Sequence, residues 1–185
     1  MRGEMTEQES EILMLCRNAE SRNKGFALLV NHYQKQVYAQ IKRMILDHDD
    51  TSDVMQNTFI KIFNGLDSFR GESKLSSWIF RIAANETLNF LQSKKRRFGF
   101  FSINDNAYLN QTLKSPEYVD YDEFELKFQK AILTLPQKQR QVFTMKFYED
   151  YTFDQLAEIL NQTAGGLKAS YHHATKKIEK YLEDN

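Results

Sequence analysis

The chain has 185 residues, which is enough for two small domains. Its 25 basic and 25 acidic residues balance, so net charge alone gives no indication of a nucleic-acid partner. One cysteine cannot form an internal disulfide, and the 4 histidines lack metal-site spacing, so we expect no metal and no cofactor. Because the sequence has no run of about 18 apolar residues and no secretory leader, we expect a cytoplasmic protein without direct membrane insertion.

Helical periodicity dominates the sequence. Only 2 prolines and 7 glycines interrupt it, and apolar residues rarely alternate strictly with polar ones. The sequence therefore predicts an all-α fold, with two small helical domains joined by a flexible linker. We expect the first domain over residues 10–97, the linker over residues 98–120, and the second domain over residues 121–185.

An amphipathic helix is predicted over residues 53–63 of the first domain. Val54, Thr58 and Ile62 recur at the spacing of a face that packs on a core. The opposite face carries amides, charges and one isoleucine, a mixture typical of a contact surface. These outward residues are Asp53, Gln56, Asn57, Ile60 and Lys61.

A serine-rich loop and a long helix follow. Residues 69–77 include one glycine and three serines, and small hydroxyls with backbone amides suit the edge of a flipped-out base. The helix that opens at Trp78 runs into the basic residues 94–97, a pairing that suits melted nucleic acid. Two simpler interpretations stay open, in which Trp78 is a core residue and the basic run a solvated helix end.

The helical pattern fails in the predicted linker. Glycine, serine, asparagine and aspartate are scattered there, over a length of about 20 residues that is long for a connection within a compact domain. Phe98, Phe100 and Phe101 are unusually apolar for a linker, and they can pack back onto the first domain.

The last third of the chain predicts a helix-turn-helix. Residues 153–160 have helical apolar spacing, and a polar turn follows over residues 161–163. The second helix has an apolar stripe that includes Leu167 and Ile178. Its other faces carry residues that can meet phosphates or base edges: Lys168, Ser170, His172, His173, Lys176 and Lys177. A generic helical hairpin with solvated lysines is the alternative, and the small Ala157 favours the closer packing of a helix-turn-helix.

These motifs together resemble the extracytoplasmic-function sigma factors of bacterial RNA polymerase, over about residues 20–182. The matching stretches are Asp53-x-x-Gln56-x-x-Phe59-x-Lys61, Phe69-Arg-Gly-x-Ser73 followed by Trp78-x-x-Arg81-Ile82-Ala83-x-Asn85, Leu135-Pro136-x-x-x-Arg140, and Ala157-Glu-x-Leu160 with Gly165-x-x-Lys168. Each stretch alone is weak evidence. Their order on either side of a variable linker makes the resemblance specific.

The resemblance implies a non-enzymatic subunit that binds core RNA polymerase and directs promoter recognition, promoter melting and transcription initiation at a restricted promoter set. The implied polymerase contacts are Asp53, Gln56, Asn57, Ile60 and Lys61. The implied contacts with the minus-ten element are Ser73, Lys74, Ser76, Ser77, Trp78, Arg81, Asn85, Lys94, Lys95, Arg96 and Arg97. The implied contacts with the minus-thirty-five element are Arg140, Gly165, Lys168, Ser170, His172, His173 and Lys176. An anti-sigma protein, often membrane-anchored in this family, is the further partner implied.

The sequence departs from the family in the second helix of the helix-turn-helix. Ser170 and His173 stand where many members have arginine, and Gly166 stands where a threonine is common. Bidentate contact between arginine and guanine is not available at those positions. We therefore predict an atypical minus-thirty-five element, or weaker dependence on it.

Two other function classes compete with this interpretation. A stand-alone regulator that binds duplex DNA would use the helix-turn-helix equally well. It leaves the helix at residues 53–63, the serine-rich loop and the helix that opens at Trp78 without a function. An enzyme finds little support, because the sequence has no phosphate-binding glycine loop, no metal-ligand set and no nucleophile–base pattern of defensible spacing.

Overall fold

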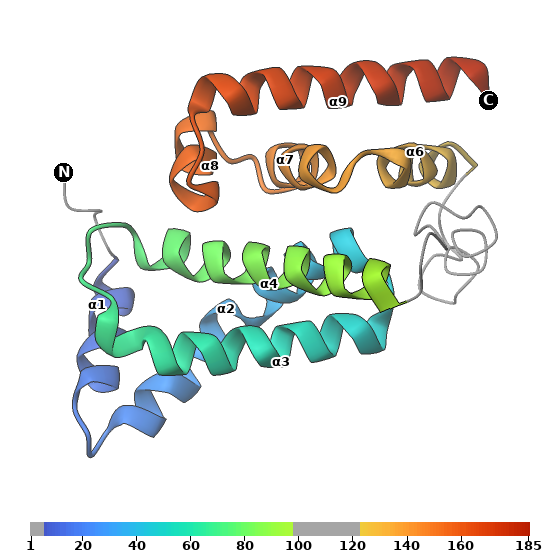
Figure 1. Cartoon of the computed structure of the whole chain (residues 1–185). Helices are drawn as coiled ribbons and strands as arrows, with labels where there is room; N and C mark the ends of the chain where they lie inside the picture. Colours follow the sequence, from blue (N-terminus) through green and yellow to red (C-terminus); the bar gives the residue numbers. More distant parts are fainter. Residues whose placement is uncertain (1–5, 98–122) are drawn as a thin grey trace. The chain divides into compact units, whose positions relative to one another are not determined.

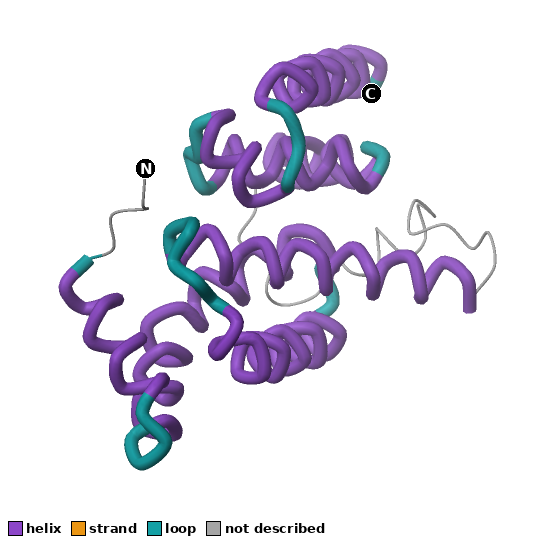
Figure 2. Tube along the Cα trace, turned by 60° about the vertical axis from the view of Figure 1, so that its left-hand side comes forward, coloured by secondary structure: helices purple, strands orange, loops and turns teal. Residues whose placement is uncertain are grey.

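The computed structural model describes residues 6–97 and 123–185, and every regular element within those ranges is a helix (Figures 1 and 2). The elements are α1 (Glu7–Arg17), α2 (Arg22–Ile45), α3 (His48–Gly65), the short 3₁₀ helix η1 (Leu66–Ser68), α4 (Leu75–Arg97), α6 (Glu123–Thr134), α7 (Gln137–Tyr148), α8 (Phe153–Leu160) and α9 (Ala164–Asp184). The predicted all-α class is confirmed.

The chain divides into two compact units, the first built mainly from α1, α2, α3 and the start of α4, and the second mainly from α6 to α9. The predicted linker, with Phe98, Phe100 and Phe101, lies outside the described residues. Residues 121–122, at the start of the predicted second domain, also lie outside them.

Side-chain caps fix where several helices begin. At α1, Thr6 Oγ1 accepts a hydrogen bond from the Glu9 amide at 3.2 Å, and the Glu9 carboxylate accepts one from the Thr6 amide at 2.8 Å. Thr152 and Gln155 form the same reciprocal box at α8, with distances of 3.2 and 2.7 Å. Such boxes satisfy amides that the helix itself leaves unpaired.

A glycine lets α1 and α2 approach each other closely. Gly25 lies near the start of α2, and a Cβ atom there would lie 2.6 Å from the backbone nitrogen of Cys16 and 2.8 Å from the carbonyl carbon of Leu15. These are backbone atoms of α1, so the contact depends on the absence of a side chain. The close packing of α1 on α2 therefore requires glycine at position 25.

A buried carboxylate also joins these two helices. Tyr33 Oη of α2 donates a hydrogen bond to Glu9 Oε1 of α1, and both residues are buried. Burial raises the pKa of Glu9, but hydrogen bonds from Tyr33 and Thr6 outweigh that effect and hold the pKa below its ordinary value. Glu9 therefore links the start of α1 to α2 as a carboxylate.

Helices α3 and α4 complete the first core. Val54, Thr58 and Ile62 of α3 are all buried, as their spacing predicts. Phe80 of α4 packs edge-on against Tyr33 of α2 with ring centroids 6.1 Å apart. Helix α4 begins at Leu75, one turn earlier than the predicted start at Trp78. The first unit thus buries one face of α3 and leaves the other face free to carry polar residues.

The second unit is organised around the long helix α9. Its buried cluster comprises Ala131, Ile132, Leu135, Phe143, Ala174 and Ile178, from α6, α7, α9 and the turn after α6. Phe143 of α7 stacks on Tyr171 of α9 with centroids 5.6 Å apart and an interplanar angle of 13°. One stripe of α9 is therefore committed to packing, and its remaining faces are available to solvent.

Candidate functional site

A groove runs along the outer face of α3. It has a volume of about 730 Å³ and is lined by Phe26, Ser52, Asp53, Met55, Gln56, Phe59, Ile60 and Phe63. Aromatic rings form much of its surface, because Phe26 of α2 meets Phe63 edge-on at 4.9 Å and Phe59 at 6.5 Å. Asp53 and Gln56 add polar groups to this apolar surface, so the groove suits an amphipathic partner.

Three of the five predicted polymerase contacts meet at this groove, namely Asp53, Gln56 and Ile60. The side chain of Ile60 is a large apolar group, and 52% of its surface is exposed. Asn57 is exposed on α3 but does not line the groove. Lys61 also lies outside the lining, and its Nζ is 2.6 Å from Glu86 Oε1 of α4. Lys61 therefore joins α3 to α4 as well as facing solvent.

The groove also includes Phe26, Met55, Phe59 and Phe63, for which the sequence predicts no role in docking. Their spacing indicates ordinary packing residues, and Phe26 lies on a different helix from the others. The signal in the sequence for this face is Ile60, an apolar residue among amides and charges. The groove itself depends on how α2 and α3 pack, which a pattern along one helix does not contain.

The serine-rich loop connects η1 to α4 through a tight turn. Gly71 has φ of +71°, a conformation that favours glycine. Phe69 at the start of the loop is buried and packs on Trp78 with centroids 5.2 Å apart. Trp78 also lies against Gly65, where a Cβ atom would come within 3.0 Å of its ring. Trp78 is thus half-buried beneath the loop, which favours its interpretation as a packing residue.

The other predicted minus-ten residues are distributed along the loop and α4. Ser73 is half-buried and Lys74 exposed in the loop, and Ser76 and Ser77 lie in the first turn of α4. Further along α4, Arg81 and Lys94 are half-buried, whereas Asn85, Arg96 and Arg97 are exposed. The side chain of Lys95 lies outside the described part of the chain. Helix α4 therefore carries these residues along its length and does not gather them in one pocket.

The helix-turn-helix has the bounds that the sequence predicts. Helix α8 spans Phe153–Leu160, and Asn161 follows in the left-handed conformation with φ of 52°. The amide of Gln162 donates to the carbonyl of Ala157 at 3.1 Å, which closes the end of α8. Thr163 then caps α9 by accepting from the Gly166 amide at 3.2 Å. The short polar turn is thus a C-cap followed directly by an N-cap.

Helix α9 separates its packing residues from the predicted DNA contacts. Leu167, Ala174 and Ile178 are buried. The exposed predicted contacts are Gly165, Lys168, His172, His173 and Lys176, and Ser170 is half-buried. A Cβ atom at Gly165 would meet no atom within 4 Å, so the backbone is bare in the first turn. This turn offers an exposed glycine backbone at a helix N-terminus, with the cation of Lys168 next to it, a combination that suits a phosphate group.

The predicted phosphate contact at Arg140 is corrected by its position in the structure. Only 2% of Arg140 is exposed, and its Nη2 donates to the carbonyls of Leu133 at 2.6 Å and Leu135 at 3.4 Å. Those carbonyls lie at and just beyond the end of α6, where a helix leaves acceptors unpaired and its dipole favours a cation. Burial lowers the pKa of Arg140 to about 10, so it stays charged at neutral pH. Arg140 therefore closes the α6–α7 connection, and its buried guanidinium is not exposed for a phosphate contact.

Among residues 6–97 and 123–185, no group of three or more histidine, cysteine, aspartate or glutamate side chains is placed to hold a metal ion. Over the same ranges, no helix has the length and apolar character needed to span a bilayer.

Comparisons with known proteins match both units. The sigma-70 region 2 family matches residues 29–97, and the sigma-70 region 4 family matches residues 125–178. The chain is similar to the RNA polymerase sigma-H factor of Pseudomonas aeruginosa, at 29% identity over 189 aligned residues that cover 97% of each chain. The ECF RNA polymerase sigma-E factor of Escherichia coli K12 is 29% identical over 188 residues, again covering 97% of each chain.

Two solved structures share the fold. CnrH, in complex with the cytosolic domain of CnrY, gives a TM-score of 0.67 at 17% identity and covers 95% of this chain and 99% of its own. The sigma factor RpoE of Bartonella quintana, in complex with the anti-sigma factor NepR, gives a TM-score of 0.66 at 21% identity. That match covers 86% of this chain and 98% of RpoE.

Proposed function

The chain belongs to the extracytoplasmic-function sigma factors of bacterial RNA polymerase, and we propose that its two units divide promoter recognition between them. The groove on α3 docks on core polymerase, the loop at residues 69–77 with α4 engages the minus-ten element, and α9 engages the minus-thirty-five element. The polymerase performs the chemistry, and the chain supplies contacts without a covalent step. Because polymerase and promoters are cytoplasmic, the chain acts in the cytoplasm.

The observation that carries this proposal is the meeting of Asp53, Gln56 and Ile60 at one apolar groove. An exposed isoleucine beside aromatic rings contributes buried apolar area when a partner binds. A neighbouring carboxylate and amide then fix the register of that partner through polar contacts. A regulator that never binds polymerase has no need of such a groove.

The direct test is co-elution of the purified chain with bacterial core polymerase. We expect a stable complex for the native chain, and loss of that complex in the double variant Asp53→Arg/Gln56→Ala. Glu20→Arg is the matched control, because it reverses an exposed acidic charge in the α1–α2 connection, away from the groove. The control should co-elute like the native chain.

Failure of the native chain to co-elute, with duplex DNA binding retained through α9, would favour the stand-alone regulator. Equal co-elution of the double variant would place the docking surface elsewhere on the chain. Circular dichroism of each variant separates lost docking from lost folding, since Asp53 and Gln56 are exposed and their replacement should leave the helices intact.

Recognition by α9 rests on cations and small polar groups. Each isolated unit supplies few cations, so its own affinity for DNA should be weak and dependent on salt. Joining both units to polymerase raises the effective concentration of the second contact once the first has formed. Binding of the holoenzyme to an upstream duplex weakens as salt rises. Lys168→Ala and Lys176→Ala should each reduce the slope of log affinity against log salt by about 1, the value for one phosphate contact. Lys180→Ala is the control, since Lys180 is exposed nearer the end of α9.

Ser170 and His173 determine which upstream sequence is accepted. Neither can make the bidentate contact to guanine that arginine makes. Selection of upstream sequences by holoenzyme should therefore return an element unlike the family's usual one, or weak selection. Recovery of the usual element would contradict this part of the proposal.

An anti-sigma protein is the proposed regulator of the same groove. The neighbour RpoE was solved in complex with an anti-sigma factor, and an exposed apolar groove needs a cover when polymerase is absent. Such a protein should compete with core polymerase for the chain. Ile60→Arg should weaken both complexes, whereas an anti-sigma partner that binds Ile60→Arg as tightly as the native chain would occupy a different surface.

A further inference from the structure

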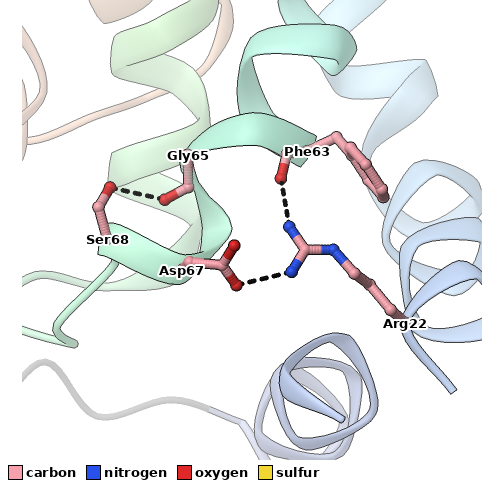
Figure 3. A network of polar contacts seen from close by, with 5 residues as sticks. All are labelled: Arg22, Phe63, Gly65, Asp67 and Ser68. Carbon is pink, nitrogen blue, oxygen red and sulfur yellow. Dashed lines mark hydrogen bonds and ion pairs between the residues drawn. The ribbon is translucent and has the colours of Figure 1, made fainter. Parts of the chain in front are cut away.

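The connection between α3 and α4 is held by an arginine from α2. Arg22 Nη1 lies 2.7 Å from Asp67 Oδ1, and Arg22 Nη2 donates a hydrogen bond to the carbonyl of Phe63 at 3.1 Å (Figure 3). The guanidinium carbon also lies 4.8 Å from the centroid of the Phe63 ring. One planar group therefore makes an ion pair, a backbone hydrogen bond and a cation–π contact.

These contacts join three parts of the first unit. Phe63 lies in the last turn of α3, where carbonyls have no partner within the helix and the dipole favours a cation. Asp67 lies in η1, directly before the loop that begins at Phe69. Arg22 is the first residue of α2. The start of α2 thus fixes the end of α3 and the base of the loop at once.

A second arginine holds the loop itself. Arg17, the last residue of α1, donates from Nη2 to the carbonyl of Phe69 at 3.0 Å. Ser68 Oγ donates to the carbonyl of Gly65 at 2.7 Å, which tightens the turn between α3 and η1 (Figure 3). Phe69 then packs on Trp78 of α4. Contacts of Phe63, Asp67 and Phe69 with other helices, and of Ser68 with its own turn, therefore hold the connection from the end of α3 to the start of the loop.

The loop's exposed residues depend on that frame for their position. Beyond Phe69, Gly71 turns the chain, and Lys74 is exposed. Neither Arg17 nor Arg22 lies among the predicted contacts with polymerase or DNA. Phe63 lines the docking groove, but Arg22 itself is not among the residues that line it, so a partner in the groove would not contact Arg22 there.

We propose that Arg22, assisted by Arg17, is a positioning residue that holds the loop at residues 69–77 in the geometry that accepts a minus-ten base. This inference rests on the proposed function of that loop. Arg22 acts through Asp67 and the end of α3 and does not touch DNA. The pair is partly exposed, with side-chain exposures of 25% for Arg22 and 66% for Asp67. An exposed ion pair contributes little to folding stability, so its loss should change loop position more than stability.

Arginine is required at this position because of its geometry. A lysine places a single point charge at the end of a flexible chain, and it cannot make the ion pair, the carbonyl contact and the planar contact with Phe63 together. The hydrogen bond from Arg22 lowers the pKa of the Asp67 carboxyl, so the pair is charged at neutral pH. In binding of the minus-ten element, Arg22→Lys should therefore behave more like Arg22→Ala than like the native chain.

The test uses reconstituted holoenzyme and a single-stranded oligonucleotide that carries the minus-ten element. Arg22→Ala and Arg22→Lys should bind core polymerase within about twofold of the native chain, and they should lose about 5- to 10-fold in affinity for the oligonucleotide. Lys24→Ala is the matched control, because it removes an exposed cation close to Arg22 on α2. The control should retain both affinities.

A second oligonucleotide separates positioning from general weakening. Single-base substitutions in the minus-ten element first identify the base whose replacement lowers the affinity of the native holoenzyme most. The second oligonucleotide carries a replacement at that base, which we assign to the loop. With this oligonucleotide the loss caused by Arg22→Ala should shrink to less than about twofold, because the contact that Arg22 positions is already gone.

Three results would overturn the inference. One is an equal loss on both oligonucleotides, which would indicate a general electrostatic effect. Another is a parallel loss of core binding or of thermal stability, which would make Arg22 a docking or folding residue. The third is discrimination by Arg22→Ala equal to that of the native chain. If no substitution in the oligonucleotide changes the affinity of the native holoenzyme, the proposed function of the loop fails instead, whatever Arg22 does.

Discussion

Helix α9 of the second unit packs with one face and carries predicted DNA contacts on another, whereas the predicted base-binding loop of the first unit is held by residues of other helices. Leu167, Ala174 and Ile178 fix α9 on one side, so Lys168 and His172 are exposed on the other by helical geometry alone. The loop after η1 has no such internal period, and Arg17 and Arg22 of distant helices hold its base. Helical spacing alone therefore decides which residues of α9 are exposed, whereas contacts with other helices decide where the residues of the loop lie.

The close contact of α1 with α2 gives the largest expected effect on the first unit. Gly25→Ala places a Cβ atom 2.6 Å from a backbone nitrogen of α1, so one helix must move. We expect a loss of about 3 kcal/mol in the free energy of unfolding, since overpacking against backbone has no cheap relief. Urea denaturation of the full chain measures this value.

The second unit supplies the matched control for that substitution. Gly165→Ala adds a methyl group where no atom lies within 4 Å, so unfolding should become about 0.5 kcal/mol less favourable through helix propensity. Equal destabilisation by the two alanines would contradict the proposed difference between the units.

Arg140 tests whether the second unit also relies on a contact between elements. Arg140→Ala removes the cation from the carbonyls of Leu133 and Leu135 and should cost about 2–3 kcal/mol, because buried acceptors lose a charged donor. Thermal unfolding measures this loss. A variant with native stability but a reduced salt dependence of DNA binding would restore Arg140 as a phosphate contact.

In the turn of the helix-turn-helix, a single residue in the left-handed conformation should have a smaller effect on the stability of the second unit. Asn161 adopts φ of 52°, so Asn161→Ala should cost about 1 kcal/mol while Asn161→Gly stays near the native value. Chemical denaturation of both variants gives the difference. Equal stability of the two variants would mean that the turn adopts another conformation in solution.

Much of the second unit could be predicted because its signals are local. The bounds of α8, the polar turn and the packing stripe of α9 follow from apolar spacing and capping residues that lie next to one another in the chain. The burial of Val54 and Ile62 in α3 follows from the same kind of pattern. Helical periodicity is a short-range property, so one sequence is enough to detect it.

The contacts that hold the first unit's loop could not be predicted in the same way. Arg22 and Asp67 are 45 residues apart in the chain, and Arg17 and Phe69 are 52 apart. Such pairs become visible only when the helices are placed in space. The burial of Arg140 is unpredicted for a related reason, since the motif Leu135-Pro136-x-x-x-Arg140 does not tell whether the guanidinium points to solvent or to the end of α6. The docking groove likewise needed Phe26 from a second helix.

The most direct test of the central claim is promoter-dependent transcription with purified core polymerase and a library of promoter fragments. The account predicts discrete new transcripts with the native chain and with Glu20→Arg, and their loss with Asp53→Arg/Gln56→Ala, whose groove lacks its polar contacts. Transcripts of equal strength from the double variant, or duplex binding by the native chain without any transcript, would contradict it.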